Sequence, residues 1–262
     1  MTSNLAIEAV GLKKSYHDPK RGRVEAVRGV DLAIRQGEVF GLLGQNGAGK
    51  TTTLRMLASI LPPTEGVARI DGIDVVADPI EARRRLGFLS GSTGLYPRLT
   101  PRETLRHFGV LHGLEGAELE RRIAELLGLF DMEAWADGRC EALSTGQRQK
   151  VSISRALLHD PAVLILAEPT TGLDVLASSA MIEFIESRRA SGTCVLLSTH
   201  VLSEAERLCD RIGIIHHGRV LACGSLEELQ HQTGEEWLED VFKRVVLAAE
   251  PAAESNTGAK SK

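Results

Sequence analysis

The chain has 262 residues, of which 43% are hydrophobic and 25% charged, and its formal net charge at pH 7 is −4. This composition argues against a disordered chain, a coiled coil and a basic nucleic-acid-binding protein, and we expect no nucleic-acid partner. At about 150 residues per domain, the length suits one large domain or a domain with a small appendage. The four cysteines show no CxxC pair and no zinc-type spacing, which predicts reduced and mostly buried thiols. No apolar run approaches the roughly 18 residues of a membrane span, so a role at a membrane requires another chain that crosses it.

The first part of the chain reads as strands followed by a turn and a helix. Residues 5–16 and 24–34 alternate apolar and polar side chains, and turn-forming residues separate them. This pattern predicts an antiparallel pair of strands. Residues 39–43 form a short apolar run that predicts a buried strand, and helical spacing follows over residues 51–61. A glycine-rich turn joins this strand to this helix.

The rest of the chain predicts an α/β core with a helical insertion. Helical patterns broken by prolines and glycines dominate residues 77–136, and we place a helical subdomain at about 90–160. Strands are expected at 163–166, 194–198, 212–215 and 219–222, with a helix from about residue 175. Alternation of strands and helices is typical of a parallel sheet. Residues 233–248 are expected to form a C-terminal helix, and residues 249–262 a disordered polar tail.

The glycine-rich turn matches the phosphate-loop pattern GxxxxGK[ST] without a mismatch, and Thr52 follows it. The matching residues are Gly44, Gln45, Asn46, Gly47, Ala48, Gly49, Lys50 and Thr51. Its place after a strand and before a helix makes a chance match improbable. The glycines let backbone N–H groups wrap around phosphate oxygens, and the helix dipole adds positive charge. Lys50 would contact the β- and γ-phosphates, and Thr51 would offer a hydroxyl to Mg²⁺, which predicts a purine triphosphate ligand.

The segment Leu143-Ser144-Thr145-Gly146-Gln147 is a candidate helix start, with Ser144 as the N-cap. It resembles the LSGGQ signature of the ATP-binding cassette (ABC) family, with a threonine in place of one glycine. The resemblance implies that Ser144, Gly146 and Gln147 bind the γ-phosphate of an ATP held by the opposite subunit. The ATPase would then be active only as a dimer that encloses two MgATP.

Further landmarks of the ABC family occur in order, so the resemblance covers about residues 5–232. Tyr16 occupies the place of the aromatic that stacks on adenine, although a half-exposed strand tyrosine explains it as well. Glu168 matches the catalytic glutamate, which orients or deprotonates the attacking water. Asp174 matches the D-loop aspartate, and His200 the switch histidine near the γ-phosphate. His216 and His217 match no landmark and are expected at the surface.

The resemblance implies an α/β P-loop NTPase fold. It comprises a RecA-like parallel-sheet core, an antiparallel β subdomain and a helical signature subdomain, and the ABC ATP-binding cassette spans residues 1–232. Lys50, Glu168 and His200 are the implied catalytic residues, with ATP and Mg²⁺ as cofactors.

Two further positions depart from the ABC pattern in ways that bear on mechanism. Ala167 stands where the family has the aspartate that supports Mg²⁺, and a methyl group cannot bind the metal or its water shell. Loss of such a partner typically costs about 10- to 100-fold in affinity or activity, so weakened turnover is expected. Gly91 stands at the place of the Q-loop glutamine, and Ser90, Ser92 or Thr93 would have to supply the oxygen instead.

Residues 94–103, GLYPRLTPRE, resemble a segment of sodium-exporting ABC ATPases, within a broader group that includes multidrug exporters. In the family this surface grips a coupling helix of the membrane subunit. Leu95, Tyr96 and Leu99 are candidate apolar anchors there, and internal packing explains them equally well.

The leading hypothesis is therefore the ATP-hydrolysing subunit of an exporter, with sodium and drugs as candidate substrates, that dimerises around MgATP as a homodimer or a heterodimer. It would sit at the cytoplasmic face of the membrane, bound to a separately encoded transmembrane permease. The alternative, favoured by Ala167, is a catalytically weakened module that acts as an ATP-dependent clamp or regulatory partner. A soluble ABC protein of translation or DNA repair is disfavoured, because those proteins usually carry two cassettes or a long coiled-coil insert.

Overall fold

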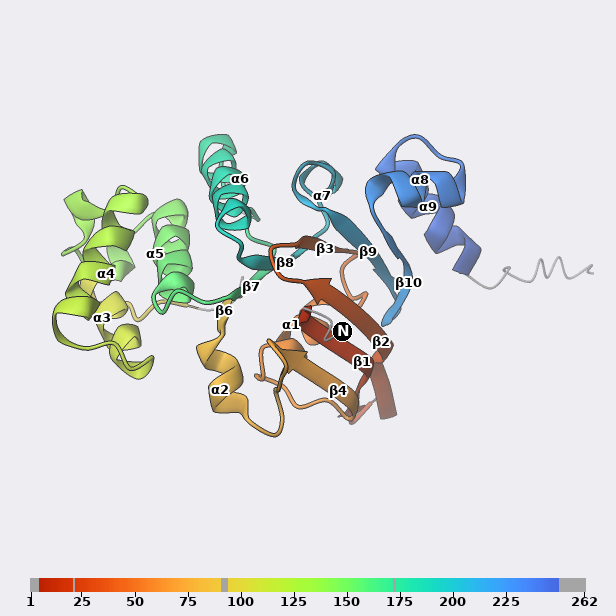
Figure 1. The fold of residues 1–262 in the computed structure, drawn as a ribbon, viewed down its shortest axis with the longest axis horizontal. Coiled ribbons are helices and arrows are strands. Elements are labelled where there is room, and N and C mark those ends of the chain that lie inside the picture. Colours follow the sequence, from red (N-terminus) through yellow and green to blue (C-terminus); the bar gives the residue numbers. More distant parts are fainter. Residues whose placement is uncertain (1–4, 21, 91–93, 172, 250–262) are drawn as a thin grey trace, which may run out of the picture.

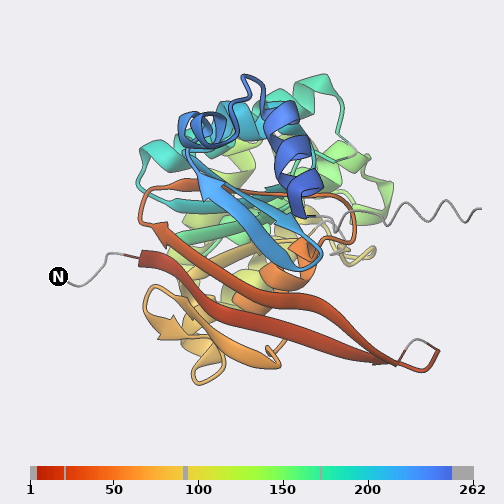
Figure 2. The ribbon, with the colours of Figure 1, turned by 90° about the vertical axis from the view of Figure 1, so that its right-hand side faces the viewer.

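The structure is a computed structural model that describes residues 5–20, 22–90, 94–171 and 173–249. Its described strands form two sheets (Figure 1). The first sheet is antiparallel with the order β2-β1-β4-β5, and its strands are β1 (Leu5–Asp18), β2 (Gly22–Arg35), β4 (Glu65–Ile70) and β5 (Ile73–Asp74). β1 and β2 form a long hairpin that extends past the body of the molecule (Figure 2). The predicted antiparallel pair is confirmed.

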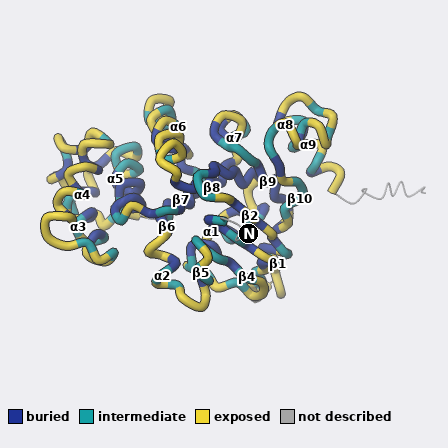
Figure 3. The backbone as a smooth tube through the Cα atoms, viewed as in Figure 1, coloured by how far each residue is buried: buried dark blue, intermediate teal, exposed yellow. Residues whose placement is uncertain are grey.

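The second sheet has the order β10-β9-β3-β8-β7-β6 and is parallel except for the antiparallel pair β9 and β10. Its strands are β3 (Val39–Leu43), β6 (Leu86–Leu89), β7 (Val163–Ala167), β8 (Cys194–Thr199), β9 (Arg211–His216) and β10 (Arg219–Gly224). Every residue of β3, β7 and β8 is buried, as Figure 3 shows for the middle of the molecule. Strands covered on both faces are apolar throughout, which is why these runs could be recognised in the sequence.

Helices cover both faces of this second sheet. α1 (Lys50–Leu57) lies between the two sheets and shares one hydrophobic core with them. α6 (Val175–Ala190) and α7 (Leu202–Leu208) pack on the opposite face. The phosphate loop leads from β3 into α1, so it lies at the carboxyl edge of the parallel strands, where ligands bind in open α/β sheets.

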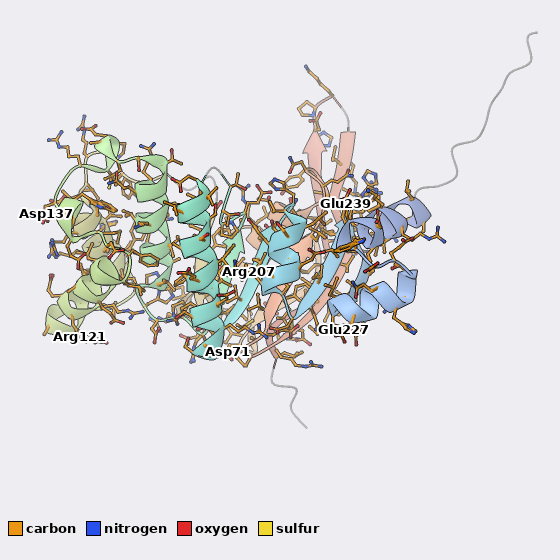
Figure 4. All side chains as sticks on the ribbon, turned by 90° about the horizontal axis from the view of Figure 1, so that it is seen from above. Asp71, Arg121, Asp137, Arg207, Glu227 and Glu239 are labelled. Carbon is orange, nitrogen blue, oxygen red and sulfur yellow. The ribbon has the colours of Figure 1, made fainter. Side chains whose placement is uncertain are left out.

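Apart from α2, the remaining helices form the two ends of the molecule (Figure 1 and Figure 4). α2 (Pro79–Arg84) leads into β6, and α3 (Pro101–Leu111), α4 (Gly116–Leu129) and α5 (Thr145–Leu157) pack together beyond it, with short 3-10 turns at Glu133–Trp135 and Cys140–Ala142. α8 (Leu226–Thr233) and α9 (Leu238–Ala249) lie at the other end, beside β9 and β10. The helical insertion is confirmed, whereas the domain boundaries within 1–232 stay a prediction.

Two helix bounds differ from those expected. The helix after the phosphate loop ends at Leu57 instead of residue 61, because Ser59 turns the chain with a φ of +53° and two prolines follow. The last helix begins at Leu238 instead of residue 233, because Gly234 ends α8 in the left-handed conformation with a φ of +76°. The expected disordered tail lies outside the described residues, except for residue 249 at the end of α9.

The histidine pair after β9 also differs in part from expectation. His217 is exposed in the turn, but His216 is only 8% exposed, so its placement at the surface was wrong. The four cysteines are free thiols, as predicted; Cys140 and Cys194 are buried, whereas Cys223 is exposed. In the part of the chain that the structure describes, no helix is long and apolar enough to span a bilayer.

Candidate nucleotide-binding site

The phosphate loop is shaped by glycines that no other residue could replace without strain. A Cβ atom on Gly44 would lie 2.4 Å from the backbone oxygen of Ile215, and one on Gly49 would lie 2.7 Å from that of Ala26. Gly49 also has a φ of +106° and is the N-cap of α1, without a side-chain capping bond. The loop therefore passes close to neighbouring backbone and presents the start of α1, where helix N–H groups and the helix dipole attract anions.

Lys50 lies at the centre of this loop. Its side chain is 5% exposed, and Nζ donates hydrogen bonds to the carbonyl oxygens of Gly44, at 2.6 Å, and Gln45, at 3.2 Å. Burial lowers the pKa of Lys50, while the nearby carboxylate of Glu168 raises it in part. The ammonium group is thus held inside the loop, within reach of an anion that the loop encloses.

The loop and Glu168 line one cavity of about 280 Å³. The other lining residues come from the loop, the start of α1 and the edge of β2: Ala26, Gln45, Asn46, Gly47, Gly49, Lys50, Thr51 and Thr52. Backbone donors, a lysine, a threonine hydroxyl and a carboxylate therefore meet in one place, and this is the chemistry that a nucleoside triphosphate with a divalent cation requires.

Glu168 follows β7 directly and has an unusual backbone conformation. Its φ is +50°, and its N–H donates to the carbonyl oxygen of Ser198 at 2.9 Å. The carboxylate oxygen Oε1 lies 3.8 Å from Lys50 Nζ and 3.4 Å from His200 Nδ1. Positive φ in a residue with a Cβ atom is uncommon and often marks a functional position. The structure thus brings together the three predicted catalytic residues.

The predicted signature residues lie outside this cavity. Ser144 is the N-cap of α5, where its Oγ accepts from the N–H of Gln147 at 3.2 Å, and Gln147 Oε1 accepts from the N–H of Ser144 at 2.9 Å. Gly146 lines a separate small cavity with Leu173 on the segment before α6. Asp174 caps α6 by accepting from the N–H of Ala177 at 2.8 Å. Within one chain, these residues do not line the phosphate cavity.

Tyr16 also stands apart from the phosphate cavity. It is 43% exposed and pairs with Val24 across the hairpin, whereas Ala26 on the same strand reaches the cavity. Tyr16 instead lines a separate cavity of about 620 Å³, together with Arg55 on α1 and Arg155 on α5. Stacking of Tyr16 on adenine stays a prediction.

The two regions that depart from the family pattern are only partly described. Gly91, Ser92 and Thr93 lie outside the described residues, and Ser90 is buried at the end of the preceding strand. Ala167 is 6% exposed at the end of β7 and presents only a methyl group.

The three candidate apolar anchors differ in burial. Leu95 packs against the core of the helical part, while Tyr96 is 53% exposed and stacks on Phe108 with ring centroids 6.5 Å apart. Tyr96 and Leu99 line a surface cavity of about 620 Å³. Internal packing therefore explains Leu95, whereas Tyr96 is available to a partner.

Sequence reasoning missed two polar residues beside the site. Glu204 on α7 accepts hydrogen bonds from Thr170 Oγ1 and from Thr199 Oγ1, the latter at 2.8 Å, and so ties α7 to β8 and to the segment after Glu168. Ser198 on β8 is 1% exposed and in register with Ala167. Glu204 belongs to no motif. Ser198 lies in the segment LLSTH that identifies His200, but this context assigned it no role.

The fold and the site define a nucleotide-binding domain of the phosphate-loop type, with a carboxylate that lines the same cavity as the loop. Comparison with known proteins agrees: a family model described as "ABC transporter" matches residues 27–171. The chain is 46% identical over 230 residues to the ABC transporter ATP-binding protein NatA of Bacillus subtilis, covering 87% of this chain and 93% of NatA. The chain belongs to the ABC transporter family.

Two further comparisons extend this result. Nod factor export ATP-binding protein I of Ralstonia nicotianae is 41% identical over 234 residues, which cover 89% of this chain and 71% of that protein. The dimeric structure of the ATP-binding cassette MJ0796, in a post-hydrolysis state bound to ADP and Pi, superposes with a TM-score of 0.77 at 26% identity, covering 84% of this chain and 98% of that one. The expected cassette fold is confirmed.

Proposed function

We propose that this chain is the ATP-binding and ATP-hydrolysing subunit of an export transporter, and that it drives a separately encoded transmembrane permease from the cytoplasmic face of the membrane. The observation that carries the proposal is the cavity that the phosphate loop and Glu168 line together. The similarity to a Nod factor export ATP-binding protein supports export as the direction of transport. The resemblance of residues 94–103 to sodium-exporting ATPases makes sodium or drug efflux the first candidates.

In this proposal the loop and Lys50 bind the triphosphate of ATP. Mg²⁺ prefers oxygen ligands and is usually bound by one or two protein oxygens together with substrate phosphates. The Thr51 hydroxyl and the Glu168 carboxylate line the same cavity, so the donor set fits this ion, and Thr51 would hold it. Among the described residues, no cluster of three His, Cys, Asp or Glu side chains forms an all-protein metal site. When bound, Mg²⁺ neutralises charge on the phosphates.

Hydrolysis would use Glu168 as the base that orients the attacking water and accepts its proton. The contact of 3.4 Å between Oε1 and His200 Nδ1 holds the carboxylate from one side, and Lys50 approaches the same oxygen from the other. Lys50 would also stabilise the charge that develops on the γ-phosphate. These three side chains come from three separate segments, which the parallel sheet brings to one edge.

Dimerisation would complete the site. Ser144, Gly146 and Asp174 do not line the phosphate cavity of their own chain, so we assign them to phosphates bound by a second subunit, either an identical copy or a homologous one. The dimeric state of MJ0796 supports this arrangement. ATP binding would close the dimer and hydrolysis would reopen it, and the permease would respond to the change.

ATP-dependent self-association tests this proposal directly. We expect sedimentation velocity to show a monomer without nucleotide and a dimer with MgATP, most clearly in the Glu168→Gln variant, in which ATP persists. Ser144→Arg, which places a bulky cation at the start of α5, should keep the chain monomeric while ATP still binds. A chain that binds MgATP but stays monomeric, with the permease present as well, would contradict the proposal.

The second candidate function, an ATP-dependent clamp with weak hydrolysis, is favoured by Ala167. We expect Ala167→Asp to raise the steady-state rate of MgATP hydrolysis about 10-fold, because a carboxylate restores an acceptor for the water shell of the metal. The rate is measured beside Glu168→Gln as the inactive control. If Ala167→Asp changes the rate little and the unmodified chain far exceeds the control, the clamp hypothesis is wrong and the chain is a full motor.

A further inference from the structure

One buried hydroxyl group near the phosphate cavity has no hydrogen-bond partner among the described residues. Ser198 lies at the carboxyl end of β8, is 1% exposed, and its Oγ makes no hydrogen bond within the described part of the chain. Its carbonyl oxygen accepts a hydrogen bond from the N–H of Glu168 at 2.9 Å. A hydroxyl carries one donor and two acceptor positions, and leaving it unpaired in a protein interior costs about 1–3 kcal/mol.

The register of the sheet places this hydroxyl beside Ala167. Ser198 pairs with Ala167 on β7 and with Leu42 on β3. Leu42 is the next-to-last residue of β3, the strand that leads into the phosphate loop. Side chains alternate between the two faces of a sheet. Cys194 and Leu196 on β8 belong to the core that contains α1, and so does Ala167. The Ser198 side chain therefore lies on the α1 face.

This face leads to the oxygen ligands of the proposed metal site. α1 begins with Lys50 and Thr51, and Thr51 lines the phosphate cavity with Glu168, the residue that follows Ala167. A carboxylate at position 167 would lie next to Ser198 and would satisfy its hydroxyl. The methyl group of Ala167 cannot, and no described residue supplies a partner for the Ser198 hydroxyl.

We propose that Ser198 is a positioning residue for the metal: its Oγ accepts a hydrogen bond from a water molecule in the hydration shell of Mg²⁺ bound with ATP. It thereby supplies in part the acceptor that Ala167 lacks. Mg²⁺ commonly keeps several of its waters in such sites, and these waters can donate hydrogen bonds to a neutral hydroxyl. This inference rests on the proposed MgATP site and assigns one further residue to it.

The test measures ATP affinity of the full-length protein with Mg²⁺ and with EDTA by isothermal titration calorimetry. We expect Ser198→Ala to reduce the gain in affinity that Mg²⁺ provides by about 10-fold, as for other outer-shell partners of metals, and to leave the affinity in EDTA unchanged. Ser198→Cys, which keeps the side-chain volume but offers only a weak acceptor, should behave in the same way. Ser154→Ala, a buried serine on α5 whose hydroxyl donates to Lys150 O at 2.9 Å, is the matched control and should leave the Mg²⁺ gain unchanged.

A second comparison separates the metal from general damage to the fold. In the Ala167→Asp background, Ser198→Ala should change the Mg²⁺ gain less than 2-fold, because the carboxylate then supplies the acceptor. Since the hydroxyl has no partner among the described residues, Ser198→Ala removes an unpaired buried group and should keep or raise the melting temperature of the nucleotide-free protein. An unaltered Mg²⁺ gain in Ser198→Ala, or a clear loss of thermal stability, would overturn the inference alone. If Mg²⁺ gives the unmodified protein no gain at all, the proposed MgATP site is wrong as well.

Discussion

Replacing Glu168 with glutamine should lower the steady-state rate of ATP hydrolysis by at least 100-fold while the affinity for ATP stays within about 3-fold. A general base contributes typically 10²- to 10⁴-fold to a rate, and an amide cannot accept the proton of the attacking water. Glutamine has the same shape, and the φ of +50° at this position strains both residues alike. An assay of released phosphate measures the hydrolysis rate, and isothermal titration calorimetry measures the affinity for ATP.

The control for this prediction is a glutamate of the same domain that lies away from the cavity. Glu186 on α6 forms an ion pair with Arg207 at 3.3 Å, and both side chains are about half exposed. Exposed pairs of this kind contribute at most about 1 kcal/mol to stability, so Glu186→Gln should keep full activity. Equal rates for Glu168→Gln and Glu186→Gln would show that Glu168 is not the base.

The contacts of Glu168 also favour it over Glu204 as the proposed base. Glu204 is 8% exposed and already accepts hydrogen bonds from two threonine hydroxyls, so its oxygens are committed to the protein. The Glu168 side chain is 30% exposed and lines the phosphate cavity. A carboxylate that must receive a proton from water needs such access, and the burial of Glu204 fits a role in bracing the loop.

The parts of the fold that the sequence predicted well are those with local signals. β3, β7 and β8 are recognisable because strands buried on both faces are apolar over their full length. The phosphate loop is recognisable because the close approach of Gly44 and Gly49 to neighbouring backbone admits no side chain, which fixes glycine at those positions. Helix ends were predicted less well, since the left-handed turn at Ser59 has no reliable signal in a single sequence.

The parts of the site that the sequence did not reveal depend on contacts between distant segments. The position of Ser198 beside Ala167 follows from the register of β7 and β8, and a serine near the end of an apolar strand carries no mark of that register. The role of Glu204 depends on the packing of α7 against Thr170 and Thr199. Motifs therefore located the phosphate loop and the proposed base, whereas the residues packed around them could be identified only from the folded structure.

Replacing Lys50 with methionine should lower the affinity for ATP about 100-fold, equivalent to about 2.7 kcal/mol. Hydrogen bonds from a charged group contribute about 1.5–3 kcal/mol each, and methionine fills the same space without charge or donor. Because burial already lowers the pKa of Lys50, the ammonium group is incompletely hydrated, and a triphosphate would supply the compensating charge. Calorimetric titration with ATP in EDTA measures the contribution of Lys50 to ATP affinity in the absence of the metal.

Two variants separate the charge of Lys50 from the shape of its surroundings. Lys50→Arg keeps the charge, but a planar guanidinium does not fit where Nζ lies 2.6 Å from Gly44 O, so its affinity should fall nearly as far. Lys243→Met removes an exposed lysine on α9, at the far end of the molecule, and should leave the affinity unchanged. If Lys50→Met binds ATP as tightly as Lys243→Met does, the phosphate loop is not the site of the triphosphate, and the cavity shared with Glu168 must serve another ligand.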